Sequence, residues 1–347
     1  MTRKPPLSVV IATLGRQTLV PTLHSLLACR GGESLEIVVV GTIAEAVMAA
    51  ALRDLLAAHG NLRHLPLSFP TGDSSNKKNA GFRKTRADIV AFIDDDVIVA
   101  HDWPDRILEA FTGSEVGMVS GPSLVPDDVP LMARLAGGAL SSAAAGYVAS
   151  RYVNDGRGPR RIRWSGIIGC NMAFRREALD RVGGFDPKFW PGEEMIVSAT
   201  VERLGYGIVF APDAWLYHYP RSSLLGFVKQ IYKYGATRIR LIRAGAGVEP
   251  TTLLPAALVL SLAALGVAAC FDQRAVYALA AVASAYLLVN VVVTVLLLFR
   301  TRHLVDLLVF FLIPVMHVSY GIAQWVECAF PGRDLSEQPT SSRTRPG

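Results

Sequence analysis

Ile89-Val90-Ala91-Phe92-Ile93-Asp94-Asp95-Asp96 decides the fold, because an apolar run ends here in three consecutive aspartates. The apolar residues predict a strand that is buried on both faces, as in a parallel sheet. Neighbouring carboxylates repel one another and resist ionisation unless a cation lies among them. Mg²⁺ and Mn²⁺ prefer oxygen ligands, and open α/β sheets bind ligands at the carboxyl ends of their strands. The stretch therefore predicts a Mg²⁺ or Mn²⁺ site; the alternative is a solvated acidic turn.

Strand-like and helix-like segments alternate around this stretch. Apolar, β-branched runs predict strands over 7–12, 36–40, 62–67 and 117–120, and the intervening segments predict helices over 18–29, 44–59, 76–86 and 103–111. Such an alternation predicts an α/β domain with a mostly parallel sheet flanked by helices. No Gly-x-Gly-x-x-Gly turn follows the first strand and no Walker-type loop occurs, which excludes those two phosphate-binding loops.

The chain changes character at Pro250. Three runs without charge follow, at 250–271, 275–299 and 307–326, and a run of about 20 residues is long enough to cross a bilayer as a helix. Arg300, Arg302 and His303 separate the second run from the third, and basic loops favour the cytoplasm. We therefore expect a multi-pass protein of the inner (plasma) membrane whose N-terminal domain is cytoplasmic. A third run that re-enters without crossing is the alternative.

Between these two parts, residues 222–243 mix apolar side chains with lysine and arginine. This pattern predicts an interfacial helix that contacts membrane lipids with anionic headgroups. The predicted organisation is a cytoplasmic domain (1–220), a basic amphipathic interface helix (221–248), three transmembrane helices (249–330) and a polar tail without fixed structure (331–347). The net charge of +6 fits membrane contact, and no aromatic-basic stripe suggests a nucleic acid partner.

A further segment, 125–165, is rich in alanine, glycine and serine and carries several arginines. A segment of this composition makes a poor core, so it is either a flexible acceptor-binding loop or an ordinary surface insertion.

Short motifs in a fixed order carry a family resemblance. They are Ser8-Val-Val-Ile-Ala-Thr, Asn79-Ala-Gly-Phe, Ile93-Asp-Asp-Asp-Val, Gly169-Cys-Asn-Met-Ala-Phe-Arg, Val182-Gly-Gly-Phe-Asp, Gly192-Glu-Glu and Trp215-Leu-Tyr-His. Together they resemble family-two glycosyltransferases with the GT-A fold, over residues 7–220. The apolar runs resemble the C-terminal membrane region of bacterial members, some of which build lipid-linked exopolysaccharide repeats.

The resemblance implies roles for the acidic residues. Asp96 matches the most direct metal ligand of an Asp-x-Asp motif, with Asp94 and His218 as further ligands. Asp94 and Asp95 would also contact the ribose and metal-bound water. Glu194 matches the general base, although the family has aspartate there, and Glu193 is its competitor.

The resemblance also implies a nucleotide-binding set, made of Thr13, Arg16, Lys78, Asn79 and Asp88. Thr13 and Arg16 would meet the nucleoside, and Lys78 would reach a phosphate. Gly41 stands where the family usually carries an aspartate against the nucleobase, so the nucleobase stays open.

The function implied is a membrane-anchored, metal-dependent, inverting glycosyltransferase. It would move a sugar from a nucleotide sugar to a lipid-linked acceptor, such as a polyprenyl-diphosphate glycan, in bacterial envelope or exopolysaccharide synthesis. Gln230-Ile-Tyr-Lys-Tyr replaces the Gln-x-x-Arg-Trp of membrane polysaccharide synthases, which argues against a processive synthase. Alternatives are a glycolipid-forming transferase on a ceramide-like or diacylglycerol acceptor, a nucleotidyltransferase, and a non-catalytic membrane scaffold that retains the fold.

Overall fold

The computed structural model describes residues 4–332. The predicted tail at 331–347 lies almost entirely outside these residues. Within the described residues the chain divides into two compact units: an α/β unit made of residues 4–129 and 147–220, and a helical unit made of residues 130–146 and 221–332. The segment expected as an acceptor loop or surface insertion is thus shared between the two units.

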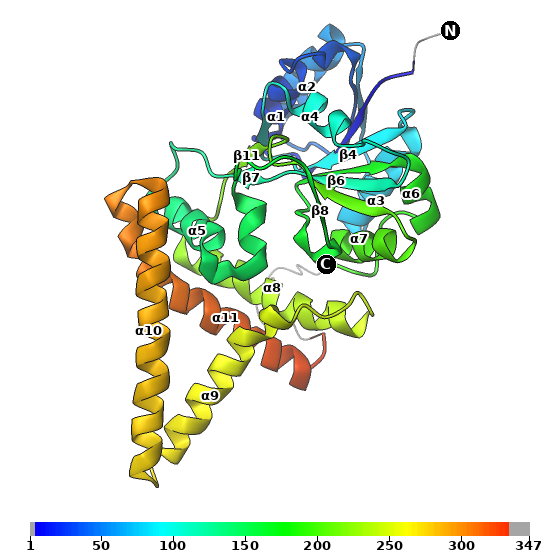
Figure 1. The fold of residues 1–347 in the computed structure, drawn as a ribbon. Coiled ribbons are helices and arrows are strands. Elements are labelled where there is room, and N and C mark those ends of the chain that lie inside the picture. The colour runs from blue at the N-terminus through cyan, green and yellow to red at the C-terminus, as the bar shows by residue number, and fades with distance from the viewer. Residues whose placement is uncertain (1–3, 333–347) are drawn as a thin grey trace, which may run out of the picture. The chain divides into compact units, whose positions relative to one another are not determined.

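The α/β unit is built on an eight-stranded sheet of order β3-β2-β1-β4-β9-β6-β10-β8 (Figure 1). Its strands are β1 (Ser8–Ala12), β2 (Glu36–Val40), β3 (Leu62–Leu65), β4 (Ile89–Ile93), β6 (Val116–Ser120), β8 (Arg160–Ile162), β9 (Asn171–Arg175) and β10 (Gly207–Phe210). The half from β3 to β4 is parallel throughout. Strand β9 runs antiparallel to both β4 and β6, so the described sheet is mixed rather than uniformly parallel.

Helices cover both faces of this sheet. They are α1 (Leu19–Leu27), α2 (Ala46–Ala58), α3 (Asp73–Lys84), α4 (Trp103–Glu109), α6 (Arg176–Val182) and α7 (Glu193–Arg203). Successive side chains of a strand point to opposite faces. Val9 and Ile11 accordingly share a core with α1, whereas a Cβ on Gly81 of α3 would lie 2.4 Å from Val10. Burial on both faces explains why these strands read as unbroken apolar runs.

A second sheet of three short strands brings distant segments together. Its order is β5-β11-β7, from Val97–Val99, Leu216–His218 and Ser123–Leu124. The antiparallel register pairs His218 with Val97, the residue after Asp96. The fully buried Asn171 supports this arrangement, because its side-chain amide donates to the carbonyl oxygens of Ala214 (2.8 Å) and Pro122 (3.1 Å). This small sheet places His218 beside the aspartates.

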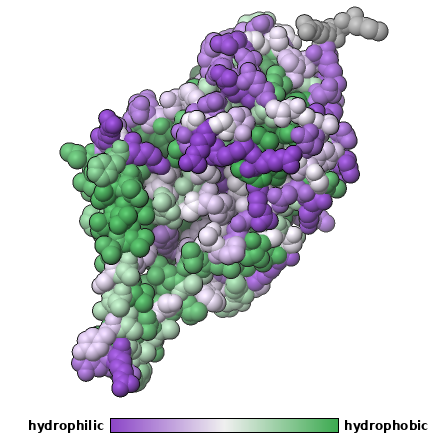
Figure 2. All heavy atoms as spheres, in the orientation of Figure 1, coloured by the Kyte–Doolittle hydropathy of each residue, from purple (hydrophilic) through white to green (hydrophobic). Residues whose placement is uncertain are grey.

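The helical unit contains α5 (Leu131–Ser141), α8 (Leu224–Arg243), α9 (Leu254–Ala268), α10 (Gln273–Thr301) and α11 (Val309–Ala329). Short 3₁₀ turns at Pro250–Leu253 and Leu304–Leu308 precede α9 and α11. Three stretches, Pro250–Ala268, Gln273–Thr301 and Leu304–Ala329, are long and apolar enough to cross a membrane. Figure 2 shows hydrophobic side chains along the length of α10 and hydrophilic ones at the tip of the α9–α10 hairpin.

Candidate active site

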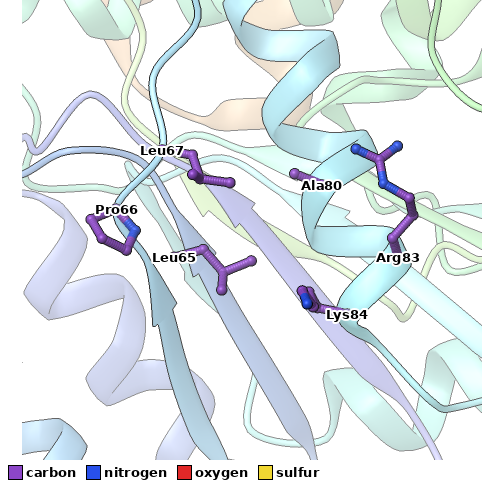
Figure 3. A pocket seen from close by; sticks show the side chains of 6 residues that line it. All are labelled: Leu65, Pro66, Leu67, Ala80, Arg83 and Lys84. Carbon is purple, nitrogen blue, oxygen red and sulfur yellow. The ribbon is translucent and has the colours of Figure 1, made fainter.

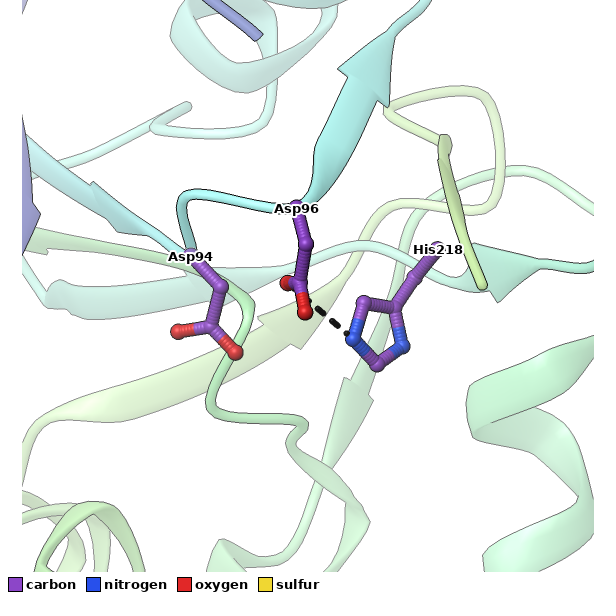
Figure 4. Close-up of side chains that lie close together, drawn as sticks. All are labelled: Asp94, Asp96 and His218. Carbon is purple, nitrogen blue, oxygen red and sulfur yellow. Dashed lines mark ion pairs between the residues drawn. The ribbon is translucent and has the colours of Figure 1, made fainter. Parts of the chain in front are cut away.

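Three potential metal ligands meet at the carboxyl end of β4. One ligand atom each from Asp94, Asp96 and His218 lies within 4.8 Å of the others. His218 Nε2 lies 3.3 Å from Asp96 Oδ1, and Figure 4 shows the side chains directed into the same space. The two carboxylates supply the oxygen donors that Mn²⁺ and Mg²⁺ prefer, and the imidazole adds one nitrogen donor. The structure therefore brings together the three residues predicted as ligands.

The electrostatics of this cluster favour a cation. Burial raises the pKa of the Asp94 carboxyl, and the charges of Asp96 and Asp95 raise it further, although Lys78 and His218 act in the opposite direction. A carboxyl group in such surroundings gains its full charge more readily when a cation lies against it.

The structure turns Asp95 away from these ligands. Its carboxylate accepts hydrogen bonds from Thr13 Oγ1 (2.5 Å) and from the backbone N–H of Leu14 (3.3 Å). The parallel register of β1 and β4 causes this contact, because it pairs Ile11 with Ile93 and so brings the residues after both strands side by side. Asp95 and Thr13 thus join the two loops that follow the central strands.

Arg16 lies against the aspartates as well. Its guanidinium is 3.1 Å from Asp96 Oδ2 and 3.5 Å from Asp95 Oδ1. This position supplies positive charge at the cluster, and a contact of Arg16 with the nucleoside stays a prediction.

Glu193 and Glu194 begin helix α7, where negative charge is favoured by the helix dipole. Glu193 Oε1 accepts a hydrogen bond from Ser74 (2.9 Å) and forms an ion pair with the buried Lys78 (2.9 Å). Burial opposes the charge on Glu193, but the Lys78 charge and the hydrogen bonds from Lys78, the backbone and Ser74 together lower the pKa of this carboxyl. Lys78 therefore pairs with a glutamate, and its contact with a phosphate stays a prediction.

Glu194 behaves differently from its neighbour. Burial raises its pKa to about 7, and the charge of Glu193 adds to the effect. A carboxyl group with a pKa near neutrality can accept and release a proton at physiological pH. Of the two candidates for the general base, the electrostatics favour Glu194.

Two other predicted residues hold structure or lie elsewhere. The Asn79 side chain exchanges hydrogen bonds with the backbone N–H (2.8 Å) and C=O (2.7 Å) of Phe185, and so fixes the Gly-Phe-Asp loop. Asp88 precedes β4 and pairs with Lys4 (2.5 Å), at the strand end opposite to Asp94. The structure does not bring Asp88 to the cluster.

Three polar residues near the site were not predicted from the sequence: Ser74, Lys77 and Arg151. Ser74 and Lys78 lie four residues apart on one face of α3, a spacing that could have linked them. Lys77 is buried and donates to Thr13 O (2.9 Å) and to Asp73 (2.5 Å). Arg151 is also buried and donates to the carbonyl oxygen of Ser165. No local pattern marks Arg151, because its contacts depend on the tertiary fold.

The absence of a carboxylate at Gly41 has a structural cause. Gly41 adopts φ +153°, and a Cβ there would lie 2.1 Å from Thr13 O. The close approach of the loop after β1 therefore requires glycine at this position.

A cavity of about 310 Å³ lies on the same unit, between β3 and α3. Leu65, Pro66, Leu67, Ala80, Arg83 and Lys84 line it (Figure 3). None of the aspartates or glutamates above takes part, so this cavity is separate from the acidic cluster.

Comparisons with known proteins identify the family and the fold of this chain. The model of a family described as "Glycosyltransferase like family 2" matches residues 5–235. The succinoglycan biosynthesis protein ExoM of Rhizobium meliloti (strain 1021) is 27% identical over 263 residues, which cover 68% of this chain and 75% of ExoM. The mannosyltransferase PcManGT from Pyrobaculum calidifontis, solved with GDP-Man and Mn²⁺, superimposes with a TM-score of 0.63 at 20% identity. That match covers 96% of this chain and 89% of PcManGT.

These matches confirm the fold and the family predicted from the motifs. The structural likeness to PcManGT carries the fold, and the family model spans well over half of the chain. This chain belongs to glycosyltransferase like family 2, and it is a glycosyltransferase with a GT-A catalytic unit and three long apolar C-terminal helices.

Proposed function

We propose that this glycosyltransferase is metal-dependent and membrane-anchored, and that it moves a sugar from a nucleotide sugar to a lipid-linked acceptor with inversion of the anomeric carbon. The observation that carries the proposal is the cluster of Asp94, Asp96 and His218, whose ligand atoms lie within 4.8 Å of one another at the end of β4. Apolar helices in the same chain supply the means of reaching a membrane-bound acceptor.

In this proposal the acidic cluster binds the nucleotide-sugar donor through a metal ion. Asp96, Asp94 and His218 would hold Mg²⁺ or Mn²⁺, which neutralises negative charge on a leaving nucleoside diphosphate. PcManGT, whose fold this chain shares, was solved with GDP-Man and Mn²⁺. The Asp95–Thr13 hydrogen bond holds the neighbouring loop, which would contact the nucleoside.

Glu194 is the proposed general base for the acceptor hydroxyl group. Inversion by a single displacement requires a base that takes the proton of the attacking hydroxyl group. Glu194 has a pKa raised to about 7, while Glu193 is held as a carboxylate by Lys78 and Ser74. In this proposal Glu194 takes the proton from the acceptor hydroxyl group. Glu193 acts on Glu194 and not on the proton itself.

The acceptor is proposed to be a polyprenyl-diphosphate glycan of the bacterial envelope or of an exopolysaccharide. The name of ExoM, a succinoglycan biosynthesis protein, supports this choice. The basic loop at Arg300, Arg302 and His303 supports a cytoplasmic catalytic unit on the inner membrane.

Transfer into native membranes tests the proposal. Membranes containing the full chain would be incubated with a panel of labelled nucleotide sugars and Mn²⁺, and the lipid products identified by mass. We expect one sugar to enter a polyprenyl-diphosphate lipid, with loss of transfer in EDTA and in Glu194→Gln membranes. A labelled ceramide or diacylglycerol would establish the glycolipid alternative. Transfer that persists in EDTA would contradict metal dependence.

A further inference from the structure

Helices α9 and α10 form a hairpin whose tip is polar. Residues 269–272 connect the two helices, and Asp272 caps α10 by accepting a hydrogen bond from the backbone N–H of Arg274. The height of a residue on the hairpin is its distance from this turn along the helix axis. It follows from the number of residues between them, at about 1.5 Å per residue.

The first half of α11 contacts α10 at one height. Asn290 Nδ2 donates to Phe310 O (2.8 Å), and the hydroxyl group of Tyr286 lies 2.9 Å from His317 Nδ1. Asn290 and Tyr286 follow Asp272 by 18 and 14 residues. The first contact has a clear cause: Pro314 has no N–H to donate to Phe310 O, and the buried Asn290 amide takes its place.

The last turns of α11 contact the first turn of α9 and the 3₁₀ turn before it at the same height. Gln324 Nε2 donates to Thr252 O, and Trp325 Nε1 donates to Ala256 O, each at 2.9 Å. Thr252 and Ala256 precede Ala269 by 17 and 13 residues. Both halves of α11 are thus equally far from the hairpin turn.

A buried ion-pair cluster fixes the C-terminal end of α11. The Glu327 carboxylate lies 3.0 Å from Arg240 and 3.1 Å from Arg243. Both arginines belong to the last turn of α8, the helix that precedes α9 in the chain. The end of α11 therefore lies at the end of α9 that is remote from the hairpin tip.

The geometry does not fit a membrane-crossing α11. From Phe310 to Trp325 the helix advances about 22 Å along its own axis, yet its contacts stay at one height on the hairpin. Figure 1 shows α11 running beside α8 and at a steep angle to α10. Membrane-spanning helices tilt by about 0–40° from the bilayer normal.

The exposed apolar side chains of α11 agree with this orientation. Phe311, Val318, Ile322 and Trp325 are 40–68% exposed, and their spacings of seven, four and three residues place them on one face of a helix. On α10, by contrast, Leu287, Leu288, Val289, Val291 and Val292 are all exposed and point in several directions. A single apolar face is typical of a helix that lies in the membrane plane.

We propose that α11 lies in the plane of the membrane beside α8, with Phe311, Val318, Ile322 and Trp325 directed into the lipid. The chain then crosses the bilayer twice, through α9 and α10, and the C-terminal end of α11 lies on the same side as α8. This proposal rests on packing within the helical unit and is independent of the proposed function.

Two native cysteines test the topology. Cys270, in the hairpin turn, and Cys328, near the end of α11, are exposed, whereas Cys29 and Cys170 are buried. The full chain would be labelled with a membrane-impermeant maleimide in sealed right-side-out membrane vesicles, and again after permeabilisation. Cys270→Ser and Cys328→Ser variants would report each site alone.

We expect the two cysteines to label from opposite sides. With three spans both would label from the same side, which would overturn the proposal. A pair of reporters fused after Gly347 gives a second reading if Cys328 reacts poorly: a fluorescent protein should fold there and an exported phosphatase should stay inactive. An active phosphatase would equally overturn the in-plane assignment. Because neither readout uses sugar transfer, failure of the proposed reaction would leave this test intact.

Discussion

Lys78 Nζ lies 2.9 Å from Glu193 Oε1, and this ion pair makes two neighbouring glutamates chemically different. Glu193 is held as a carboxylate, with its pKa lowered by Lys78. Glu194, the next residue, has its pKa raised to about 7 by burial and by the charge of Glu193. The two neighbouring carboxyl groups thus have pKa values shifted in opposite directions, which suits Glu194 to the role of base proposed for it.

Replacing Glu194 with glutamine should abolish transfer without abolishing donor binding. A general base contributes about 10²- to 10⁴-fold to a rate, so kcat should fall by that factor. Thermal stabilisation by a nucleoside diphosphate with Mn²⁺ should persist. Glu202→Gln, farther along α7, is the matched control. Near-normal turnover in Glu194→Gln would transfer the role of base to another residue.

Activity should depend on pH through Glu194. The base must be ionised, and its pKa in the folded protein is about 7, so kcat/KM should fall as the pH decreases below about 7. Glu193→Gln removes a charge that raises this pKa, and the acid limb should therefore move to lower pH. An acid limb that stays in place in Glu193→Gln would show that the two carboxyl groups are not coupled.

The positive charge of Lys78 should affect both the stability of the protein and its pH profile. Lys78→Met leaves Glu193 buried without its cation, and loss of one partner of a buried pair costs about 3–5 kcal/mol. We expect a lower melting temperature and a changed pH profile. Lys78→Arg keeps the charge and should restore much of both. Equal behaviour of the methionine and arginine variants would contradict an electrostatic role.

Gly41 should be intolerant of a side chain. Its φ of +153° and the 2.1 Å approach of Thr13 O leave no room for a Cβ, and a strained backbone costs about 1–3 kcal/mol. Gly41→Ala should lower the melting temperature measurably. Gly60→Ala is the control, because nothing lies within 4 Å of a Cβ there. Equal stability of the two variants would refute the steric explanation for the missing carboxylate.

Much of the fold follows from local patterns. The apolar run before Asp94 predicted β4, and the alternation of strands and helices predicted the parallel half of the sheet, β3 to β4. The antiparallel insertion of β9 was not predictable, because periodicity describes a strand and not its neighbours. Helix α3 begins at Asp73, three residues before its predicted start, since polar residues open it.

The candidate site was only partly predictable from the sequence. The aspartates were visible as an electrostatic anomaly, but the position of His218 beside Asp96 came only from the family resemblance, since the contact spans the register of β5 and β11. Partners of buried polar groups, such as Lys78 with Glu193 or Asn79 with Phe185, depend on packing between distant segments. Hydropathy predicted the three apolar helices and could not give their directions.

The proposed metal site is tested most directly by the thermal stability of the solubilised full chain, measured with Mn²⁺ and a panel of nucleoside diphosphates. We predict that one diphosphate raises the melting temperature only when Mn²⁺ is present. Asp96→Ala and His218→Ala should lose this increase, while Asp127→Ala, which removes an exposed carboxylate outside the cluster, should keep it. An Mn²⁺-dependent increase of wild-type size in Asp96→Ala would contradict the assignment of the metal to this cluster.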